Sequence, residues 1–324
     1  MHRVDYVVKR LAFAVMTIFV AITINFLLFR ALPGNAVADL ARAPHASPQL
    51  RAALTHEFGL DQPMWKQYVI YLHQLVFHAN LGISFADSQP VMGELADKLK
   101  NTIPMVFVGT FIAIVIGIVT GFLSAWRRSG VVDQVSTNTA IVFYALPTQF
   151  IGMMLIFLFA TVLPTAGMRN EVNNFFSHGS TWSSIKDIGA HMVLPAVTLA
   201  LTLFGEYTLV VRSSMLETLG EDYVLTARAK GLPQRRIVVS HALRNAMLPI
   251  ATLVALSLGF IVAGAILVEI IFSWPGIGQA IYEAVSTRDY PMLQGAFLIL
   301  TVSVVLFNFI ADLIYFKLDP RIVE

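Results

Sequence analysis

Residues 103–126 read IPMVFVGTFIAIVIGIVTGFLSAW, and this stretch decides the class of fold because it carries no charged side chain. The apolar core of a bilayer is about 30 Å thick and is crossed by roughly 20 residues of α-helix. Lipid offers no hydrogen-bond partners, and a helix satisfies its own backbone groups there. The stretch therefore predicts a membrane-spanning helix in an all-α integral membrane protein.

Five further stretches extend this prediction to six transmembrane helices. They are residues 11–29, 139–162, 191–211, 246–268 and 292–311, of which only 191–211 contains a charged residue, Glu206. An even number of spans puts both chain ends on the same side of the membrane. The first stretch is longer than the apolar run of about 7–15 residues in a signal peptide, so we expect it to remain as a span.

The composition of the chain agrees with a membrane protein and excludes several other classes. Of the 324 residues, 56% are hydrophobic and 13% are charged, whereas a soluble domain carries about 25% charged residues. The sequence contains no cysteine, which excludes disulfide bonds and thiolate metal sites. The net charge of +2 gives no reason to expect nucleic-acid binding. The scattered histidines and carboxylates predict neither a metal site nor a catalytic site.

The positions of Lys and Arg predict how the chain is oriented. Short loops on the cytoplasmic side of a membrane are enriched in these residues. If the N-terminus is cytoplasmic, the two short outside loops hold only Arg169, Lys186 and Arg288, and the inside segments hold many more. We therefore predict that both termini are cytoplasmic and that residues 1–324 form a single transmembrane domain.

Two of the predicted outside segments are unusual. The long loop over 30–102 has apolar residues at helical spacing within 65–75, which predicts a short amphipathic helix on the membrane surface or on a partner. Segment 272–291 is too apolar for an ordinary loop, and Trp274 with Pro275 breaks the helix that precedes it. Backbone at this depth must be covered by protein or line a water-filled path. We expect either a re-entrant lid or pore element, or a simple interfacial anchor.

The inside loop over 213–245 predicts a short helix that ends in a turn. Glu221 and Asp222 would lie in its first turn, where the partial positive charge of the helix end favours carboxylates. Gly231 is placed to adopt the left-handed conformation that ends a helix, and Pro233 prevents continuation. The loop is either a docking surface for a partner or a basic loop whose cations contact lipid headgroups.

One face of this predicted helix combines a large side chain with small residues. Tyr223, Ala227 and Gly231 are spaced by four residues and therefore share a face. We expect another surface to approach this face closely.

Polar and helix-breaking residues inside the spans mark candidate positions on a transport path, because ionisable groups in lipid are costly. Glu206 either lines such a path, pairs with a cation on a partner, or reaches out to the cytoplasmic surface. Pro147 predicts a kink near Phe143, and Glu269 lies where a gate would form at the outside end of the fifth span. The candidate path and gate residues are Phe143, Pro147, Gln149, Glu206, Glu269, Trp274 and Pro275.

Small and amide residues within the spans predict contacts between helices. Gly109, Gly117 and Gly121 would let another helix approach the second span closely. Asn25 in the first span is expected to form a hydrogen bond to a neighbouring helix.

Motifs distributed along the whole chain resemble one family of transporters. Residues 226–232 read TARAKGL and residues 241–249 read HALRNAMLP. They resemble the cytoplasmic EAA loop of binding-protein-dependent ABC permeases, in the variant of the dipeptide/oligopeptide/nickel family, although Leu225 and Thr226 replace the acidic residue and the first alanine of the general pattern. Further matches are LPG at 32–34, GLDQP at 59–63, NLGISF at 80–85, FSWPGIG at 272–278, RDYP at 288–291 and LDPR at 318–321.

The resemblance implies the transmembrane-domain fold of a type I ABC importer in a bacterial cell membrane, paired with a second, homologous permease. Two ATP-binding subunits would bind ATP and Mg, so no cofactor is expected in this chain, which lacks a G-x-x-x-x-G-K-[ST] loop. An extracytoplasmic solute-binding protein would deliver the cargo. The helix over 221–232 would couple the pore to ATP hydrolysis. The implied coupling residues are Glu221, Asp222, Tyr223, Ala227, Arg228, Ala229, Lys230, Gly231, Leu232, Arg235 and Arg236.

Other classes of membrane protein stay open on the residues alone. An ion-coupled secondary transporter would carry mid-membrane carboxylates and broken spans in two corresponding halves, and the sequence offers one such carboxylate and one broken segment. A membrane enzyme would need a nucleophile or metal cluster near one interface, and a receptor scaffold would need neither. The resemblance leaves the cargo open among dipeptides, longer peptides, nickel chelates and oligosaccharides.

Overall fold

The computed structural model describes residues 3–31, 62–170 and 181–318, apart from residues 244, 248, 252, 255–256 and 258–264. Within these ranges the regular elements are helices, and the strand pairing among them is one isolated bridge between Ile83 and Pro90. The all-α prediction is confirmed for this part of the chain.

Within the described ranges, four helices are long and apolar enough to cross a membrane. They are α1 (Arg3–Ala31), α5 (Val91–Trp126), α9 (Thr181–Leu219) and α15 (Tyr290–Leu318). Each contains one predicted span. α5 begins well before its predicted span, because the helix continues through Pro104.

The third predicted span is not one straight helix. α6 (Val131–Ala145) and α7 (Thr148–Phe159) meet at 104°. Leu146 between them has φ −77° and ψ 135°, which is the extended conformation that a following proline imposes on its neighbour. The kink predicted near Phe143 therefore lies a few residues further on, where the helix breaks at Leu146 and Pro147.

In the fifth predicted span, residues 246–268, positions 248, 252, 255–256 and 258–264 lie outside the described residues. Its described end continues as α13 (Ile266–Ile271), and α14 (Ile277–Thr287) follows. The helix thus breaks at Trp274 and Pro275, where the sequence predicted a break.

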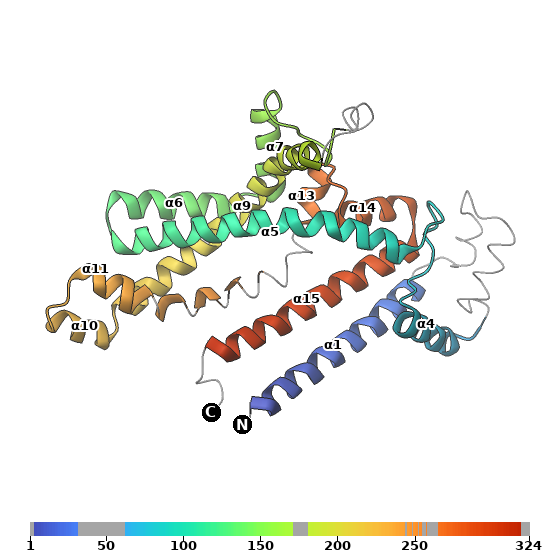
Figure 1. The fold of residues 1–324 in the computed structure, drawn as a ribbon, viewed down its shortest axis with the longest axis horizontal. Coiled ribbons are helices and arrows are strands. Elements are labelled where there is room, and N and C mark those ends of the chain that lie inside the picture. Colours follow the sequence, from blue (N-terminus) through green and yellow to red (C-terminus); the bar gives the residue numbers. More distant parts are fainter. Residues whose placement is uncertain are drawn as a thin grey trace.

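The helices are arranged between two ends of the molecule (Figure 1). α10 (Asp222–Ala229), α11 (Gln234–Arg236) and the π-helix η1 (Ile237–Ala242) lie at one end, here called the α10 end. α4 (Met64–His78) and α14 lie at the other, here called the α14 end. α1 and α15 run antiparallel side by side. Asn25 Nδ2 on α1 donates to the Gln294 carbonyl of α15 at 2.9 Å, as predicted for an amide between helices.

α5 and α9 pack along a seam of glycines. A Cβ atom at Gly109, Gly117 or Gly121 would collide with side chains or backbone of α9. Across the same seam, the hydroxyl groups of Thr120 and Thr208 form a hydrogen bond of 2.8 Å. The predicted close helix contact is confirmed, and its partner is a helix of the same chain.

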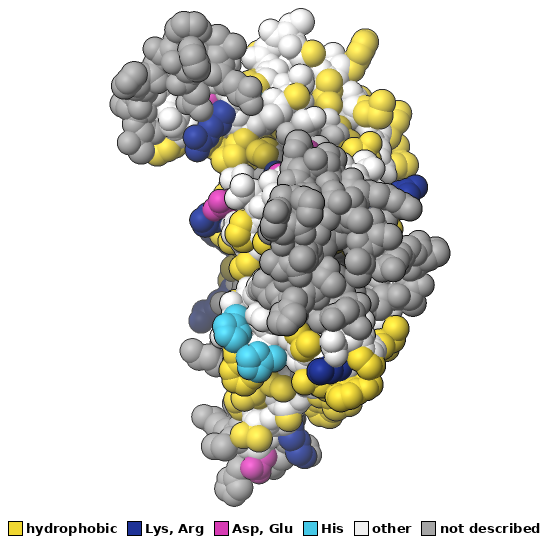
Figure 2. Space-filling view, turned by 90° about the vertical axis from the view of Figure 1, so that its right-hand side faces the viewer, with side chains coloured by type: hydrophobic (Ala, Val, Ile, Leu, Met, Phe, Trp, Pro, Cys, Tyr) yellow, Lys and Arg dark blue, Asp and Glu magenta, His cyan; other side chains and the backbone are white. Residues whose placement is uncertain are grey.

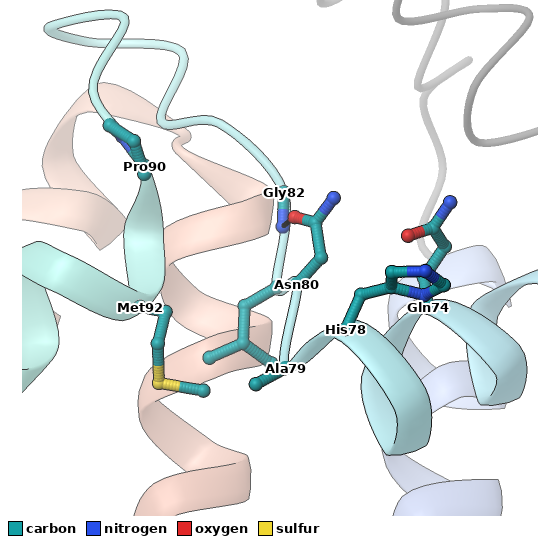
Figure 3. A pocket seen from close by; sticks show the side chains of 8 residues that line it. Gln74, His78, Ala79, Asn80, Gly82, Pro90 and Met92 are labelled. Carbon is teal, nitrogen blue, oxygen red and sulfur yellow. Dashed lines mark hydrogen bonds between the residues drawn. The ribbon is translucent and has the colours of Figure 1, made fainter.

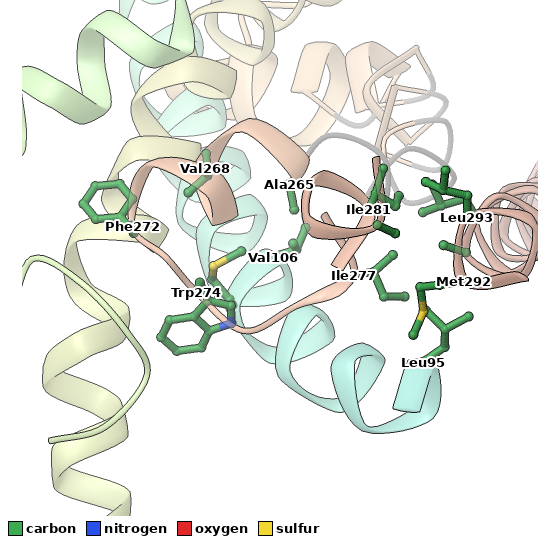
Figure 4. Close-up of a cluster of buried hydrophobic side chains, with 14 of the residues drawn as sticks. Leu95, Val106, Ala265, Val268, Phe272, Trp274, Ile277, Ile281, Met292 and Leu293 are labelled. Atoms are coloured by element: carbon green, nitrogen blue, oxygen red, sulfur yellow. The ribbon is translucent and has the colours of Figure 1, made fainter. Parts of the chain in front are cut away.

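The main hydrophobic core lies at the α14 end (Figure 4). Trp274 is fully buried in it. Leu95 and Val106 enter from α5, whereas Met292 and Leu293 enter from α15. This core therefore joins α5, the α13–α14 turn and α15 into one packed unit.

Much of the outer surface of the helices is apolar. Figure 2 shows hydrophobic side chains spread over the described surface, with few charged ones among them. Phe157 of α7 is 86% exposed, and Phe13 and Phe19 of α1 are more than half exposed. Exposure of so large an apolar surface to water is unfavourable. This surface is therefore suited to contact with lipid or with another apolar surface.

Candidate functional site

The predicted gate residue Glu269 is the centre of a buried polar cluster at the α14 end. Its Oε1 accepts a hydrogen bond from Thr102 Oγ1 at 2.7 Å, and its Oε2 accepts one from the Gly278 N–H at 2.6 Å. The Gln279 N–H also points to Oε2, at 3.3 Å. The Glu269 side chain is fully buried. It caps the first turn of α14, where a carboxylate is favoured, and it ties α13 to α5.

Trp274 and Pro275 are held by the same part of α5. Trp274 Nε1 donates to the Asn101 carbonyl at 3.0 Å, and Asn101 Nδ2 donates to the Pro275 carbonyl at 2.9 Å. The Ile277 N–H donates to Thr102 Oγ1 at 3.0 Å. The turn between α13 and α14 is therefore fixed to α5 from both sides.

The path residues predicted in the third span lie around the α6–α7 break. The Phe143 ring packs edge-on against Phe204 of α9, with ring centroids 5.5 Å apart. Pro147 is the N-cap residue of α7, and Gln149 in the first turn is exposed. α7 packs on the end of α13, which Gly152 allows to come close. The break and the Trp274 turn thus contact one hydrophobic core.

The predicted docking loop forms α10 and the turn that follows it. Glu221 is the N-cap residue and Asp222 opens the helix, so both acidic residues lie at its start, as expected. Gly231 has a φ of +74°, the left-handed conformation predicted for the end of the helix. The chain then turns at Pro233 into α11.

The outward face of α10 differs from the face that the spacing predicted. Ala227 is buried with Val224 and Ile237 in a small cluster, because η1 folds back over that side of the helix. Tyr223 is partly exposed, and its hydroxyl oxygen accepts a hydrogen bond from Asn245 Nδ2 at 2.7 Å. Leu232 is half-buried. The exposed residues of this segment are Glu221, Asp222, Tyr223, Leu225, Thr226, Arg228, Ala229, Lys230, Gly231, Pro233, Gln234, Arg235 and Arg236, and they form its outward surface.

The ion pair between Asp133 and Arg212 was not predicted from the sequence. Asp133 on α6 is buried, and Arg212 on α9 donates to its carboxylate from Nε at 2.7 Å and from Nη2 at 3.0 Å. The available signal was a carboxylate beside an apolar stretch, but the predicted span began at residue 139 and left Asp133 outside it. Glu206, which the sequence singled out, is half-buried on α9.

A second missed contact joins two stretches that are far apart in the sequence. Ser84 Oγ donates to Asp289 Oδ2 at 2.5 Å, and the Met292 N–H donates to Asp289 Oδ1 at 3.1 Å. Asp289 therefore caps α15 and also holds the segment before α5. The NLGISF and RDYP stretches meet here.

An open cavity of about 470 Å³ lies at the α14 end, between the end of α4 and the start of α5 (Figure 3). Gln74 and His78 line one side, and Pro90 and Met92 line the other. The whole lining is Gln74, His78, Ala79, Asn80, Leu81, Gly82, Pro90 and Met92. Within the described part of the chain, no group of three His, Asp or Glu side chains could hold a metal ion.

Two protein-family models match the chain. Residues 113–324 match the binding-protein-dependent transport system inner membrane component, and residues 3–106 match the N-terminal region of membrane components of such systems. The chain belongs to this family of permeases. The resemblance drawn from the motifs is thereby confirmed.

Relatives match the permease along its whole length. The dipeptide transport system permease protein DppB of Escherichia coli (strain K12) is 37% identical over 335 residues, covering 98% of each chain. The di/tripeptide transport system permease protein DppB of Pseudomonas aeruginosa (strain UCBPP-PA14) is 35% identical, again over 98% of each chain. The glutathione transport system permease protein GsiC of Escherichia coli O6:H1 (strain CFT073) is 32% identical with the same coverage.

A solved structure shares the fold of the permease. It is an inward-facing conformation of the MetNI methionine ABC transporter, with a TM-score of 0.54 and 20% sequence identity. The match covers 72% of the permease and 99% of that chain. At this identity the likeness concerns the fold alone, which is that of an ABC transporter's membrane subunit.

The permease is therefore a multi-pass inner-membrane subunit of a binding-protein-dependent ABC transporter. As a member of this family it is a transport subunit and not an ATPase, and no cofactor is expected in it. Its transporter works with ATP-binding and solute-binding partners. Family membership also removes the alternative of a stand-alone ion-coupled transporter.

Proposed function

We propose that the permease forms one half of the membrane path of an ATP-driven importer for peptides of two or three residues. The observation that carries this proposal is the 37% identity with a dipeptide permease over 98% of both chains. The other two relatives are named for di/tripeptides and for glutathione, which is itself a tripeptide. A second, homologous permease would form the other half of the path.

In this proposal the chain crosses the membrane six times, with both termini and the α10 end in the cytoplasm. The basic residues support this orientation, because Arg127 and Arg128 follow the end of α5 and several cations surround α10. Segment 213–245 is then inside the cell. Segments 30–102 and 272–291 are then outside, at the α14 end.

We further propose that the outward surface of α10 docks in a groove on an ATP-binding subunit. Leu225 is 53% exposed at its centre, and Arg228 and Lys230 stand beside it. An apolar centre with a charged rim is typical of protein interfaces. The Gly220 N–H donates to the Glu217 carbonyl at 2.9 Å in a tight turn between α9 and α10. Because this connection is short, we expect α9 to move when α10 is displaced.

The solute-binding protein would dock at the α14 end in this proposal. α4 and the cavity of Figure 3 are the surfaces that the described residues offer there. The path itself would run past the α6–α7 break and the Trp274 turn, which share one core. Because Glu269 and Trp274 are bound to α5, a gate at this place would open only if α5 moved with it.

Reconstitution of the chain with its second permease, its ATP-binding subunits and its binding protein in lipid vesicles tests the proposal. We expect uptake of a labelled dipeptide that requires both ATP and the binding protein. Uptake without ATP would overturn the importer. Equal uptake of a labelled hexapeptide would contradict the cargo class and leave the importer standing.

A pair of matched substitutions tests the docking surface. Leu225→Asp places a charge at the centre of the outward surface of α10. We expect the ATP hydrolysis that the binding protein stimulates in the reconstituted complex to fall at least tenfold. Loss of a central interface residue typically weakens binding by about 2 kcal/mol or more. Val131→Asp is the control, because Val131 is 76% exposed at the same end but off α10, and a helix start tolerates a carboxylate. Equal activity of the two variants would exclude the docking role.

A further inference from the structure

The carboxylate of Asp133 is held by donors from three helices. Besides the two bonds from Arg212 on α9, it accepts hydrogen bonds from Ser124 Oγ on α5 at 2.5 Å and from the Ser129 N–H at 2.9 Å. Thr137 Oγ1 on α6 adds a fifth donor at 3.2 Å. Asp133 is buried, whereas the Arg212 side chain is 28% exposed. We call this group of five residues the Asp133 clamp.

The clamp lies close to the proposed coupling surface. Arg212 lies seven residues before the end of α9 at Leu219, which is roughly 10 Å along the helix axis. The turn through Gly220 and Glu221 is tight, because the Glu221 N–H donates to the Thr218 carbonyl at 3.3 Å. A displacement of α10 would therefore be passed along α9 to the clamp, which joins α9 to α6 close to the end of α9.

The bidentate ion pair fixes the relative orientation of α6 and α9, which apolar packing alone would not do. Replacing a buried ion pair by apolar side chains of the same shape often leaves stability unchanged or higher. The planar guanidinium fork, however, fixes the orientation of its two partners as well as their distance. The clamp thus sets the rotation of α9 relative to α6, which apolar contacts between smooth helices would leave free.

Further along the same two helices, close contacts between α6 and α9 oppose movement of one helix along the other. Gly205 on α9 lies so close to Ala140 and Tyr144 on α6 that a Cβ atom there would press on their backbone. With the glycine seam between α5 and α9, three helices are joined at membrane depth and locked by the clamp near the α10 end. The far end of α6 is the break at Pro147, where α7 turns away.

We propose that Asp133 and Arg212 are positioning residues that make α5, α6 and α9 move as one body when α10 is displaced. This body delivers the displacement to the α6–α7 break. The proposal rests on the proposed function, since it concerns how ATP hydrolysis drives transport. It adds residues outside the docking loop whose loss would separate hydrolysis from uptake.

A neutral pair, Asp133→Asn with Arg212→Gln, tests the proposal. It removes both charges together, so neither charge is left buried alone, and the hydroxyl groups of Ser124 and Thr137 can rotate to accept from the new amide. The variant complex is reconstituted in vesicles, and dipeptide uptake and ATP hydrolysis are measured side by side. We expect assembly and melting temperature near those of the wild type, with about a tenfold fall in peptide taken up per ATP hydrolysed, a size typical of coupling between sites.

The second ion pair near the α10 end is the matched control. Arg10 Nη1 on α1 lies 3.1 Å from Asp312 Oδ2 on α15 and does not involve α9. Arg10→Gln with Asp312→Asn removes the same kinds of charge from a more exposed pair, whose side chains are 44% and 29% exposed. We expect this variant to keep the wild-type ratio of uptake to hydrolysis.

Pulsed EPR distances supply a second readout, which reports whether α6 and α9 keep one relative orientation. The natural sequence has no cysteine, so labels at Val135→Cys on α6 and Ser213→Cys on α9, both at exposed positions, report one distance. We expect a single narrow distance, the same with and without trapped nucleotide, and a broad one in the neutral pair.

The outcomes distinguish a failure of the proposed function from a failure of the clamp proposal. If wild-type vesicles take up no dipeptide in response to ATP and binding protein, the proposed function fails. If they do, and the neutral pair keeps both the wild-type ratio and the narrow distance, the clamp proposal is overturned. If Asp133→Asn and Arg212→Gln only lower the melting temperature while uptake per ATP stays constant, the pair is structural and the proposal is equally overturned.

Discussion

Glu269 accepts hydrogen bonds from α5 and from the first turn of α14, and this constrains the residues around it. A Cβ atom at Gly276 would collide with the Glu269 carboxylate, and one at Gly278 would collide with Ile266. The glycines of the FSWPGIG stretch are therefore explained by the space that the Glu269 carboxylate and Ile266 occupy. Neither glycine has a positive φ, so the constraint is steric.

Gly276→Ala is predicted to destabilise the chain. Forcing an extra carbon into a packed site costs about 1–3 kcal/mol, and here it would also disturb the hydrogen bonds of Glu269. We expect a lower melting temperature in detergent, followed by tryptophan fluorescence, to which buried Trp274 contributes together with the three other tryptophans.

Gly93→Ala is the control for this prediction. A Cβ atom at Gly93, in the first turn of α5, meets nothing within 4 Å. Alanine in a helix is favoured over glycine by up to about 1 kcal/mol, so the melting temperature is expected to hold or rise. Equal losses in both variants would mean that the space at Gly276 is not what the glycine provides.

Local chemistry explains which residues the sequence predicted correctly. Gly231 and Glu221 lie where helix-end rules placed them, because those rules depend on the neighbouring few residues. The Asp133–Arg212 pair joins positions 79 residues apart, and no periodicity in the sequence encodes such a distance. The burial of Ala227 depends on η1 folding back, which the spacing of α10 alone does not contain.

At the level of elements, two prolines inside apolar stretches have opposite effects. Pro147 ends α6 and starts α7 at 104°, whereas α9 continues through Pro195. Hydropathy read both stretches as single spans. At Pro147 the chain also gains a packing partner by turning away, since α7 packs on α13 through Gly152.

Pro147→Ala is predicted to straighten the α6–α7 break. Alanine frees Leu146 from the extended conformation and restores an N–H, and an unpaired N–H in lipid costs several kcal/mol. Labels at Val135→Cys and Phe157→Cys, both on exposed residues, measure the change. A continuous helix would separate their backbones by roughly 33 Å, and we expect the distance to lengthen toward this value.

Pro195→Ala provides the comparison for the break. Because α9 is already continuous there, labels on either side of Pro195 should keep their distance. An unchanged distance in Pro147→Ala would show that packing of α7, and not the proline, holds the bend.

On the scale of the whole molecule, the structure separates a packed end from the end that carries α10. The main core and the Glu269 cluster lie at the α14 end, and α10 with its exposed cations lies at the other. Amino-acid composition and apolar runs predicted the membrane class and four of the spans directly. The apolar run over 246–268 likewise predicts a span, of which positions 248, 252, 255–256 and 258–264 lie outside the described residues.

Labelling from one side of the membrane tests the proposed orientation. Thr226→Cys on α10 and Ser286→Cys on α14 are at exposed positions, and the natural chain has no cysteine to interfere. A membrane-impermeant maleimide should label Ser286→Cys in intact spheroplasts and Thr226→Cys only in inside-out vesicles. Labelling of both positions from one side would contradict six spans with cytoplasmic termini.

The lengths of α5 and α9 bear on how the protein fits its membrane. They contain 36 and 39 residues, which at about 1.5 Å per residue make rods of roughly 54 and 58 Å against an apolar core of about 30 Å. Part of each rod extends beyond the apolar core. The apolar run over 103–126 of α5 is itself roughly 36 Å long, so it fits the core by tilting, and the glycine seam obliges α9 to tilt with it. A thinner or thicker bilayer would therefore change the tilt of both helices. Because α10 follows the end of α9, the distance of the proposed docking surface from the membrane plane would then depend on the length of the lipid chains.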